Sequence, residues 1–224
     1  AGPIFHSIVL VDEINRAPPK VQSAFLEAMA EGQVTAAGKT HPLPDPFMVV
    51  ATQNPIEHEG TFPLPEAQLD RFLLYVVIGL PSPAAELKIL DLVESENLGA
   101  DHPIVNRLHP EEIFTARKEA AGIYLSPAVK DYIVRLVTAP RGDAVPDIRK
   151  LIEHPPSPRG TFALASAAKA RAYIAGRDYV TPDDVADLAA DALAHRMVLT
   201  WRATADGETA RGLVARLLER IAPL

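Results

Sequence analysis

The sequence predicts a parallel α/β fold over residues 1–80, followed by an all-helical part over residues 81–224. Three short, unbroken apolar runs occur before residue 80, and such runs are typical of strands that a parallel sheet buries on both faces. After residue 81 the strand-like runs stop, and helix-start signals with apolar stripes follow one another. These observations predict two domains, 1–80 and 81–224.

Three strands are predicted in the first domain, at Ile8–Val11, Phe47–Val50 and Leu73–Ile78. Their short length, their β-branched residues and the flanking Pro or Gly favour strands over helices. A small hairpin is expected over residues 34–41, with Gly38 near its middle.

One helix is predicted between the first two strands, from Pro19 to about Glu31. Its apolar residues recur at the spacing that forms one stripe along a helix. They are Val21, Ala24, Phe25, Ala28 and Met29. Gly32 follows, and glycine at this place is typical of a residue that ends a helix in the left-handed conformation.

The helices of the second domain begin at a repeated signal, a hydroxyl residue that caps the helix and a proline in its first turn. The signal occurs at Ser126–Pro127, Ser157–Pro158 and Thr181–Pro182, and many of the 21 prolines therefore mark boundaries. Thr181 and Asp184 also have capping-box spacing. The predicted apolar stripes are Val129, Ile133, Leu136 and Val137; Phe162, Ala165, Ala168 and Ala172; Val185, Leu188, Ala189 and Ala192; and, in a last helix, Leu213, Leu217 and Ile221. Trp201 is expected to be a packing anchor.

Composition excludes several classes of protein. No apolar run approaches the roughly 18 residues of a membrane span. The chain has no cysteine, so a disulfide framework is impossible. A net charge of -7 argues against a nucleic-acid binder held mainly by phosphate contacts. The opening residues lack the basic flank and cleavage site of a signal peptide, and we expect a cytoplasmic protein.

Two acidic residues, Asp12 and Glu13, follow the first predicted strand directly. The carboxyl ends of strands are where open α/β sheets place their ligands, and adjacent carboxylates there are costly unless a cation or water uses them. In a Walker B interpretation, Asp12 holds Mg²⁺ through water and Glu13 polarises the attacking water. The alternative is a strand that ends in two solvated acids.

The second predicted strand leads into Gln53, Asn54 and Pro55. A side-chain amide at a γ-phosphate can position water without adding charge, so Asn54 is a candidate sensor. The alternative is ordinary turn chemistry, because Asn-Pro is a turn signal.

Two arginines are candidates for contact with phosphate. Arg71 follows Asp70; it is either an arginine finger offered to a neighbouring subunit or one half of a surface ion pair. Arg159 lies in the first turn of a predicted helix, where a cation opposes the helix dipole, so either a ligand or simple exposure accounts for it. The run Glu57-His58-Glu59 could bind a metal but is better explained as a solvated loop.

Several blocks, taken in order, closely resemble the MoxR-type AAA+ ATPases. They are Val11–Lys20 (VDEINRAPPK), Leu26–Met29 (LEAM), Ala51–Ile56 (ATQNPI), Pro63–Phe72 (PLPEAQLDRF), Tyr179–Val185 (YVTPDDV) and Ala194–Met197 (AHRM). The resemblance covers nearly the whole chain. It implies part of a P-loop NTPase sheet followed by a helical lid.

The resemblance also implies roles for the site residues. Asp12 and Glu13 would form Walker B, Asn54 would be sensor 1, Arg71 the arginine finger and Arg159 sensor 2. It implies an ATP- and Mg-dependent chaperone that assembles as a homo-oligomeric ring, expected to be a hexamer. Such a ring would remodel or activate partners, among them proteins with von Willebrand factor A domains.

One departure from the family stands out: no GxxxxGK[ST] loop occurs anywhere in the 224 residues. In this family that loop precedes Walker B, and the chain begins just before Walker B, so we expect a truncated chain that is inactive alone. Two alternatives stay open. One is a non-catalytic assembly module with a vestigial nucleotide site, and the other is a relative that works on DNA, against which the negative charge counts.

Overall fold

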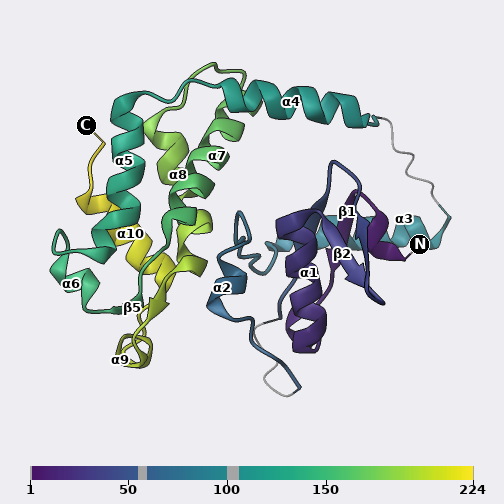
Figure 1. The fold of residues 1–224 in the computed structure, drawn as a ribbon, viewed down its shortest axis with the longest axis horizontal. Helices are drawn as coiled ribbons and strands as arrows, with labels where there is room; N and C mark the ends of the chain where they lie inside the picture. The colour runs from purple at the N-terminus through teal and green to yellow at the C-terminus, as the bar shows by residue number, and fades with distance from the viewer. Residues whose placement is uncertain (1, 55–59, 100–105, 224) are drawn as a thin grey trace.

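The computed structural model describes residues 2–54, 60–99 and 106–223, and Figure 1 shows an α/β part (purple to blue) beside a bundle of helices (green to yellow). Strands β1 (Ile8–Val11) and β4 (Met48–Ala51) pair in parallel, in register from Ile8 with Met48 to Val11 with Ala51. The predicted parallel sheet followed by a helical lid is confirmed, with the second strand one residue later than expected.

The helix between these strands forms as predicted. It is α1 (Pro19–Glu31), and Gly32 ends it with φ 61°, a left-handed conformation that glycine adopts without steric cost. Its buried residues are Gln22 and Ala28. The expected stripe is only partly right, since Val21 is exposed.

The hairpin is also confirmed, as β2 (Gln33–Ala36) and β3 (Lys39–Pro42) pair in antiparallel fashion. The two residues between them have positive φ, 50° at Ala37 and 75° at Gly38. Two successive positive φ values match the twist of the flanking strands in a tight hairpin turn.

The third predicted strand, Leu73–Ile78, is wrong: this segment forms no strand, and Ile78 is 91% exposed. A strand needs a hydrogen-bonded neighbour, and the described β1–β4 pair offers this segment no partner. The backbone N–H of Tyr75 instead donates to Asp191 O at 2.8 Å. The expectation of a sheet buried on both faces also fails in the described part, since Ile8 and Leu10 are exposed.

The remaining elements are mostly helical. Short 3-10 turns occur at Pro3–Phe5 (η1), Ile14–Arg16 (η2), Ala139–Arg141 (η3) and Ala194–Arg196 (η4). The helices are α2 (Glu66–Leu69), α3 (Pro83–Asn97), α4 (Pro110–Gly122), α5 (Pro127–Thr138), α6 (Pro146–Arg149), α7 (Pro158–Ile174), α8 (Pro182–Leu193), α9 (Trp201–Ala205) and α10 (Ala210–Arg220). Strands β5 (Ile152–His154) and β6 (Val198–Leu199) form a small antiparallel pair.

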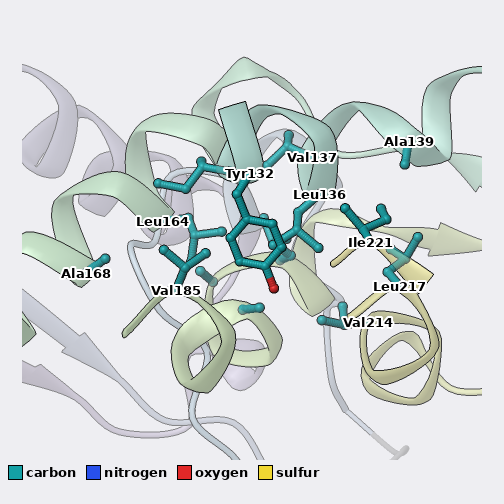
Figure 2. Close-up of a cluster of buried hydrophobic side chains, with 14 of the residues drawn as sticks. Tyr132, Leu136, Val137, Ala139, Leu164, Ala168, Val185, Val214, Leu217 and Ile221 are labelled. Carbon is teal, nitrogen blue, oxygen red and sulfur yellow. The ribbon is translucent and has the colours of Figure 1, made fainter. Parts of the chain in front are cut away.

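The main hydrophobic core lies between α5, α7, α8 and α10. Figure 2 shows Tyr132 and Leu136 of α5 directed toward Leu164, Val185 and Leu217 of the other helices. Leu136, Val185 and Leu217 come from the predicted stripes of α5, α8 and α10, whereas Tyr132 and Leu164 are core residues that those stripes did not include. No helix in the described ranges combines the length and apolarity needed to span a bilayer.

The three predicted helix starts are confirmed by their cap hydrogen bonds. The backbone N–H of Val129 donates to Ser126 Oγ at 3.2 Å, and that of Arg159 donates to Ser157 Oγ at 3.1 Å. Thr181 and Asp184 form the expected capping box. Local hydroxyl chemistry therefore decides where these helices begin.

Two predicted core residues are exposed instead. Phe162 is 69% exposed, because α7 turns a face of smaller residues, among them Ala168 and Ala172, toward the core. Trp201 is 81% exposed, because it begins the five-residue helix α9, which buries only Ala203.

Candidate functional site

Two carboxylates lie where the parallel strands end. Asp12 directly follows β1, and Thr52 directly follows β4, whose last residue Ala51 is in register with Val11. Because the strands are parallel, residues 12 and 52 reach the same edge of the sheet. The first two predicted site residues, Asp12 and Glu13, are therefore placed at the carboxyl edge.

The hydroxyl of Thr52 orders this acidic pair. It donates to Asp12 Oδ1 at 2.6 Å and accepts the backbone N–H of Glu13 at 2.8 Å. Glu13 has φ 48° and ψ 54°, a left-handed conformation that is uncommon for a residue other than glycine and that surrounding contacts must hold. The backbone therefore turns sharply at Glu13, and the two carboxylates have different partners, Thr52 for Asp12 and Arg16 for Glu13.

The carboxylate of Glu13 also has a cation beside it. Arg16 Nε lies 3.0 Å from Glu13 Oε2, and the Glu13 side chain keeps 33% of its surface exposed. The carboxylate is thus reachable from solvent and held by Arg16 at the same time.

Polar contacts tie the loop after β1 to the segment after β4. Asn15 Nδ2 donates to Asn54 O at 3.4 Å, and the backbone N–H of Phe62 donates to Asn15 O at 2.6 Å. The buried amide of Gln22 lies within hydrogen-bond distance of three carbonyls, those of Ile14, Ala17 and Phe62, at 3.0–3.2 Å. Asn54 is therefore placed at the same edge as the acidic pair. Residues 55–59, which include the candidate metal run Glu57-His58-Glu59, lie outside the described residues.

The two predicted arginines share a second location. Arg71 and Arg159 line one cavity of about 400 Å³ together with Asp70 and Arg196. Asp70 forms ion pairs with Arg196 at 3.0 Å and with Arg159 at 3.9 Å. The expected alternative for Arg71, an ion pair with the adjacent Asp70, is thus replaced by pairs with arginines distant in sequence. In the described part no hydrogen bond or ion pair joins Arg71 or Arg159 to the acidic pair.

The residues at the sheet edge fit a magnesium ion that is bound partly by other groups. The described ranges contain no cluster of three or more His, Cys, Asp or Glu that could hold a metal alone. Mg²⁺ commonly binds one or two carboxylates and completes its shell with phosphate oxygens and water. Asp12 is exposed, and its carboxylate can serve in that way while Thr52 orients it.

Sequence reasoning missed Thr52, Gln22 and Arg196. Each is a polar residue with at least one partner far along the chain: Thr52 and Asp12 are 40 positions apart, Gln22 and Phe62 are 40 apart, and Arg196 and Asp70 are 126 apart. The signal that could have found them is their position: each lies inside, or just after, one of the blocks of sequence that resemble the family.

Comparisons with known proteins identify the family of the chain. Residues 1–74 match the model of the ATPase family associated with various cellular activities (AAA), and residues 147–217 match the AAA lid domain. The chain is 42% identical over 225 residues to the chaperone MoxR1 of Mycobacterium tuberculosis, covering 99% of this chain and 58% of that protein. It is 44% identical over 229 residues to the uncharacterized protein YeaC of Bacillus subtilis, covering 98% of this chain and 66% of YeaC.

A solved structure has the same fold. The crystal structure of a predicted ATPase from Cytophaga hutchinsonii superposes with a TM-score of 0.92 at 36% identity, over 100% of this chain and 68% of that one. The two family models, the two relatives and the solved structure thus indicate the same family of ATPases. The chain belongs to the MoxR-type AAA+ ATPases.

Proposed function

We propose that this protein hydrolyses ATP with Mg²⁺ at the subunit interfaces of a homo-oligomeric ring, expected to be a hexamer. The ring would act in the cytoplasm and use the energy to remodel or activate partner proteins, including proteins with von Willebrand factor A domains. The family assignment and the similarity to the chaperone MoxR1 support this proposal. The chain spans about three-fifths to two-thirds of the length of these relatives, so we propose the activity for the full-length protein.

The acidic pair ordered by Thr52 is the observation that carries the proposal. Asp12 would hold Mg²⁺ through water, and Glu13 would polarise the attacking water. Bound ATP with Mg²⁺ would supply the phosphoryl group to be transferred. The Thr52 hydroxyl fixes Asp12 by its side chain and Glu13 by its backbone, so the backbone of Glu13 keeps a constant position relative to the carboxylate of Asp12.

The other roles follow the predicted positions. Asn54 would be sensor 1, a neutral amide that orients water beside the acidic pair. Arg71 would be the arginine finger for a neighbouring subunit, and Arg159 would be sensor 2 for the nucleotide of its own chain. In this proposal the core domain spans residues 1–80 and the lid spans residues 81–224.

A substitution of Glu13 tests the proposal. In the full-length protein, Glu13→Gln keeps the size of the side chain but removes its basicity, so we expect ATP turnover to fall on the order of 10²-fold while ATP still binds. The matched control is Glu94→Gln on the exposed helix α3, which should leave turnover unchanged. Turnover of the Glu13→Gln protein within about twofold of wild type would show that Glu13 is not the activating residue.

A second candidate function is a non-catalytic assembly module with a vestigial nucleotide site. The ion pair between Arg16 and Glu13 favours it, because the carboxylate proposed to polarise water is already engaged by a cation. Under this alternative the full-length wild-type protein would assemble and bind partners without hydrolysing ATP. Measuring ATP turnover and partner binding in the same preparation separates the two functions.

A further inference from the structure

The segment that carries Arg71 is bonded to the helical part of the molecule. Leu74 packs against the core of the helical bundle, and the backbone N–H of Tyr75 donates to Asp191 O at 2.8 Å. The Tyr75 ring stacks on His195, with ring centroids 5.9 Å apart. Although residues 70–75 belong to the predicted α/β domain, residues 1–80, these contacts join them to α8 and η4.

One buried guanidinium makes most of the polar contacts to this segment. Arg196 Nη2 donates to Phe72 O at 2.6 Å and to Asp70 O at 3.1 Å, and Nη1 donates to Leu73 O at 3.3 Å. Arg196 Nε also donates to Asp70 Oδ1 at 3.0 Å. Only 3% of the Arg196 side chain is exposed. A planar guanidinium with donors in several directions can satisfy three carbonyls and a carboxylate together, which a lysine ammonium cannot.

A neutral histidine accompanies this buried cation. His195 Nε2 lies 2.7 Å from Arg196 Nη1, and since a guanidinium can only donate, the imidazole nitrogen accepts. Burial, and then the adjacent Arg196, lower the pKa of His195 to about 4. Near neutral pH, therefore, Arg196 carries the positive charge of this pair.

Asp70 connects the same segment to the start of α7. Its Oδ2 accepts the hydroxyl of Ser157 at 2.7 Å and lies 3.9 Å from Arg159 Nη1. Ser157 is the cap of α7, and Arg159 lies in the first turn of that helix. One carboxylate thus contacts both Arg196 and the helix end that carries Arg159.

We propose that Arg196 is a positioning residue for Arg71. Together with Asp70, it fixes residues 70–75, the segment that carries Arg71, to the lid. Arg71 therefore moves with the lid and not with the sheet. The inference rests on the proposed function, in which Arg159 meets the nucleotide of its own chain and Arg71 meets that of the neighbour. Asp70 then connects the two sites, because it contacts both the segment of Arg71 and the helix end of Arg159. Arg196 itself contacts no nucleotide.

The first test compares turnover by full-length variants. Arg196→Lys keeps the charge but loses the forked contacts, so we expect kcat for ATP to fall on the order of 10²-fold with KM changed less than about twofold, as for a finger misplaced by about 1 Å. Asp70→Asn, which nearly preserves side-chain volume, should lower kcat in the same direction. The control is Arg177→Lys, which disrupts a bidentate pair with Asp184 elsewhere in the lid. We expect it to lower the melting temperature without lowering kcat.

The second test mixes two weakly active variants. A subunit with Arg196→Lys has an intact Glu13, and a subunit with Glu13→Gln has a correctly placed Arg71. In mixed rings, about a quarter of the interfaces combine the intact halves, so activity should recover well above that of either variant alone. Arg71→Ala mixed with Glu13→Gln should recover in the same way and serves as the benchmark.

The outcomes separate the two proposals. If the wild-type full-length protein hydrolyses no ATP, the proposed function fails and this inference fails with it. If wild type is active and Arg196→Lys retains the kcat of Arg177→Lys, the positioning role is wrong while the proposed function stands. Should Arg196→Lys fail to fold, as judged by its melting curve, Asp70→Asn takes its place in both tests. Low activity without recovery on mixing would place the effect of Arg196 in its own subunit's site and overturn the proposal.

Discussion

At the scale of single residues, Asp184 shows how one carboxylate can both cap a helix and fix a neighbouring loop. Its two oxygens accept from Arg177 at 2.6 and 2.7 Å, and Oδ2 also accepts the backbone N–H of Thr181 at 2.8 Å. The hydrogen bonds from Arg177 are the main reason that the pKa of Asp184 falls from 3.8 to about 2. The ionised carboxylate is therefore part of the folded structure.

This pairing predicts how stability depends on acid. Because the folded pKa lies below the unfolded one, the stabilisation is fully present above about pH 4 and is lost as the pH falls toward 2. Asp184→Asn should lower the free energy of unfolding by about 2 kcal/mol at pH 7 and show a smaller further loss between pH 4 and 2. Asp183→Asn, which changes the exposed acid next to it, is the matched control. Urea denaturation across this pH range measures both, and equal acid sensitivity of the two variants would contradict the prediction.

The candidate site residues were predictable from sequence where their chemistry is local. Asp12 and Glu13 follow an apolar run directly, so their position at a strand end needed no knowledge of distant residues. Thr52, which orders them, could not be assigned, because its role exists only once two strands far apart in sequence become parallel neighbours. The partners of Arg196 were hidden for the same reason.

At the scale of elements, the start of α7 combines two roles of one hydroxyl. Ser157 Oγ accepts the backbone N–H of Arg159 and donates to Asp70. Among the described residues, the cap of α5, Ser126, accepts a backbone N–H in the same way but donates to no carboxylate, and it is similarly half-buried. Comparing Ser157 with Ser126 therefore measures how much the contact with Asp70 contributes to the stability of the protein.

Replacing each cap by alanine should therefore have unequal effects. Ser126→Ala should cost about 1 kcal/mol of stability, the usual value of a lost cap. Ser157→Ala should cost about 1 kcal/mol more, because Asp70 also loses a hydrogen-bond donor. Chemical denaturation of both variants under one condition gives the difference directly. An equal loss in the two variants would show that the Ser157–Asp70 contact adds nothing to stability.

A helix or strand could be predicted from the sequence when the residues that determine it lie within its own segment. Helix starts depend on a cap and a proline a few residues apart, and Ser126, Ser157 and Thr181 all fulfilled that role. The run Leu73–Ile78 has the composition of a strand but pairs with no described strand, since strand formation depends on a partner as much as on side chains. Phe162 was wrong for a different reason: Ala168 and Ala172 of the same predicted stripe are buried, so the stripe was drawn too wide around the helix.

At the scale of the whole molecule, the net charge and the missing phosphate-binding loop predict that these 224 residues alone bind nucleotide weakly. The sequence has no phosphate-cradling loop and a net charge of -7, so little in it attracts a triphosphate beyond single arginines such as Arg71 and Arg159. Calorimetry with Mg²⁺ and ATP should give a dissociation constant in the millimolar range or weaker. Micromolar binding by this chain would contradict the prediction, and full-length protein measured in parallel is the control.

Burial is distributed unequally between the two parts of the molecule. In the described residues before Leu73, the buried apolar side chains are Val9, Ile14, Ala28 and Leu64, whereas the bundle of α5, α7, α8 and α10 contains most of the core. Regions with few buried apolar contacts open more readily than the average of a protein. When these 224 residues are studied alone, the α/β part is therefore where a protease should make its first cuts, before it reaches the bundle.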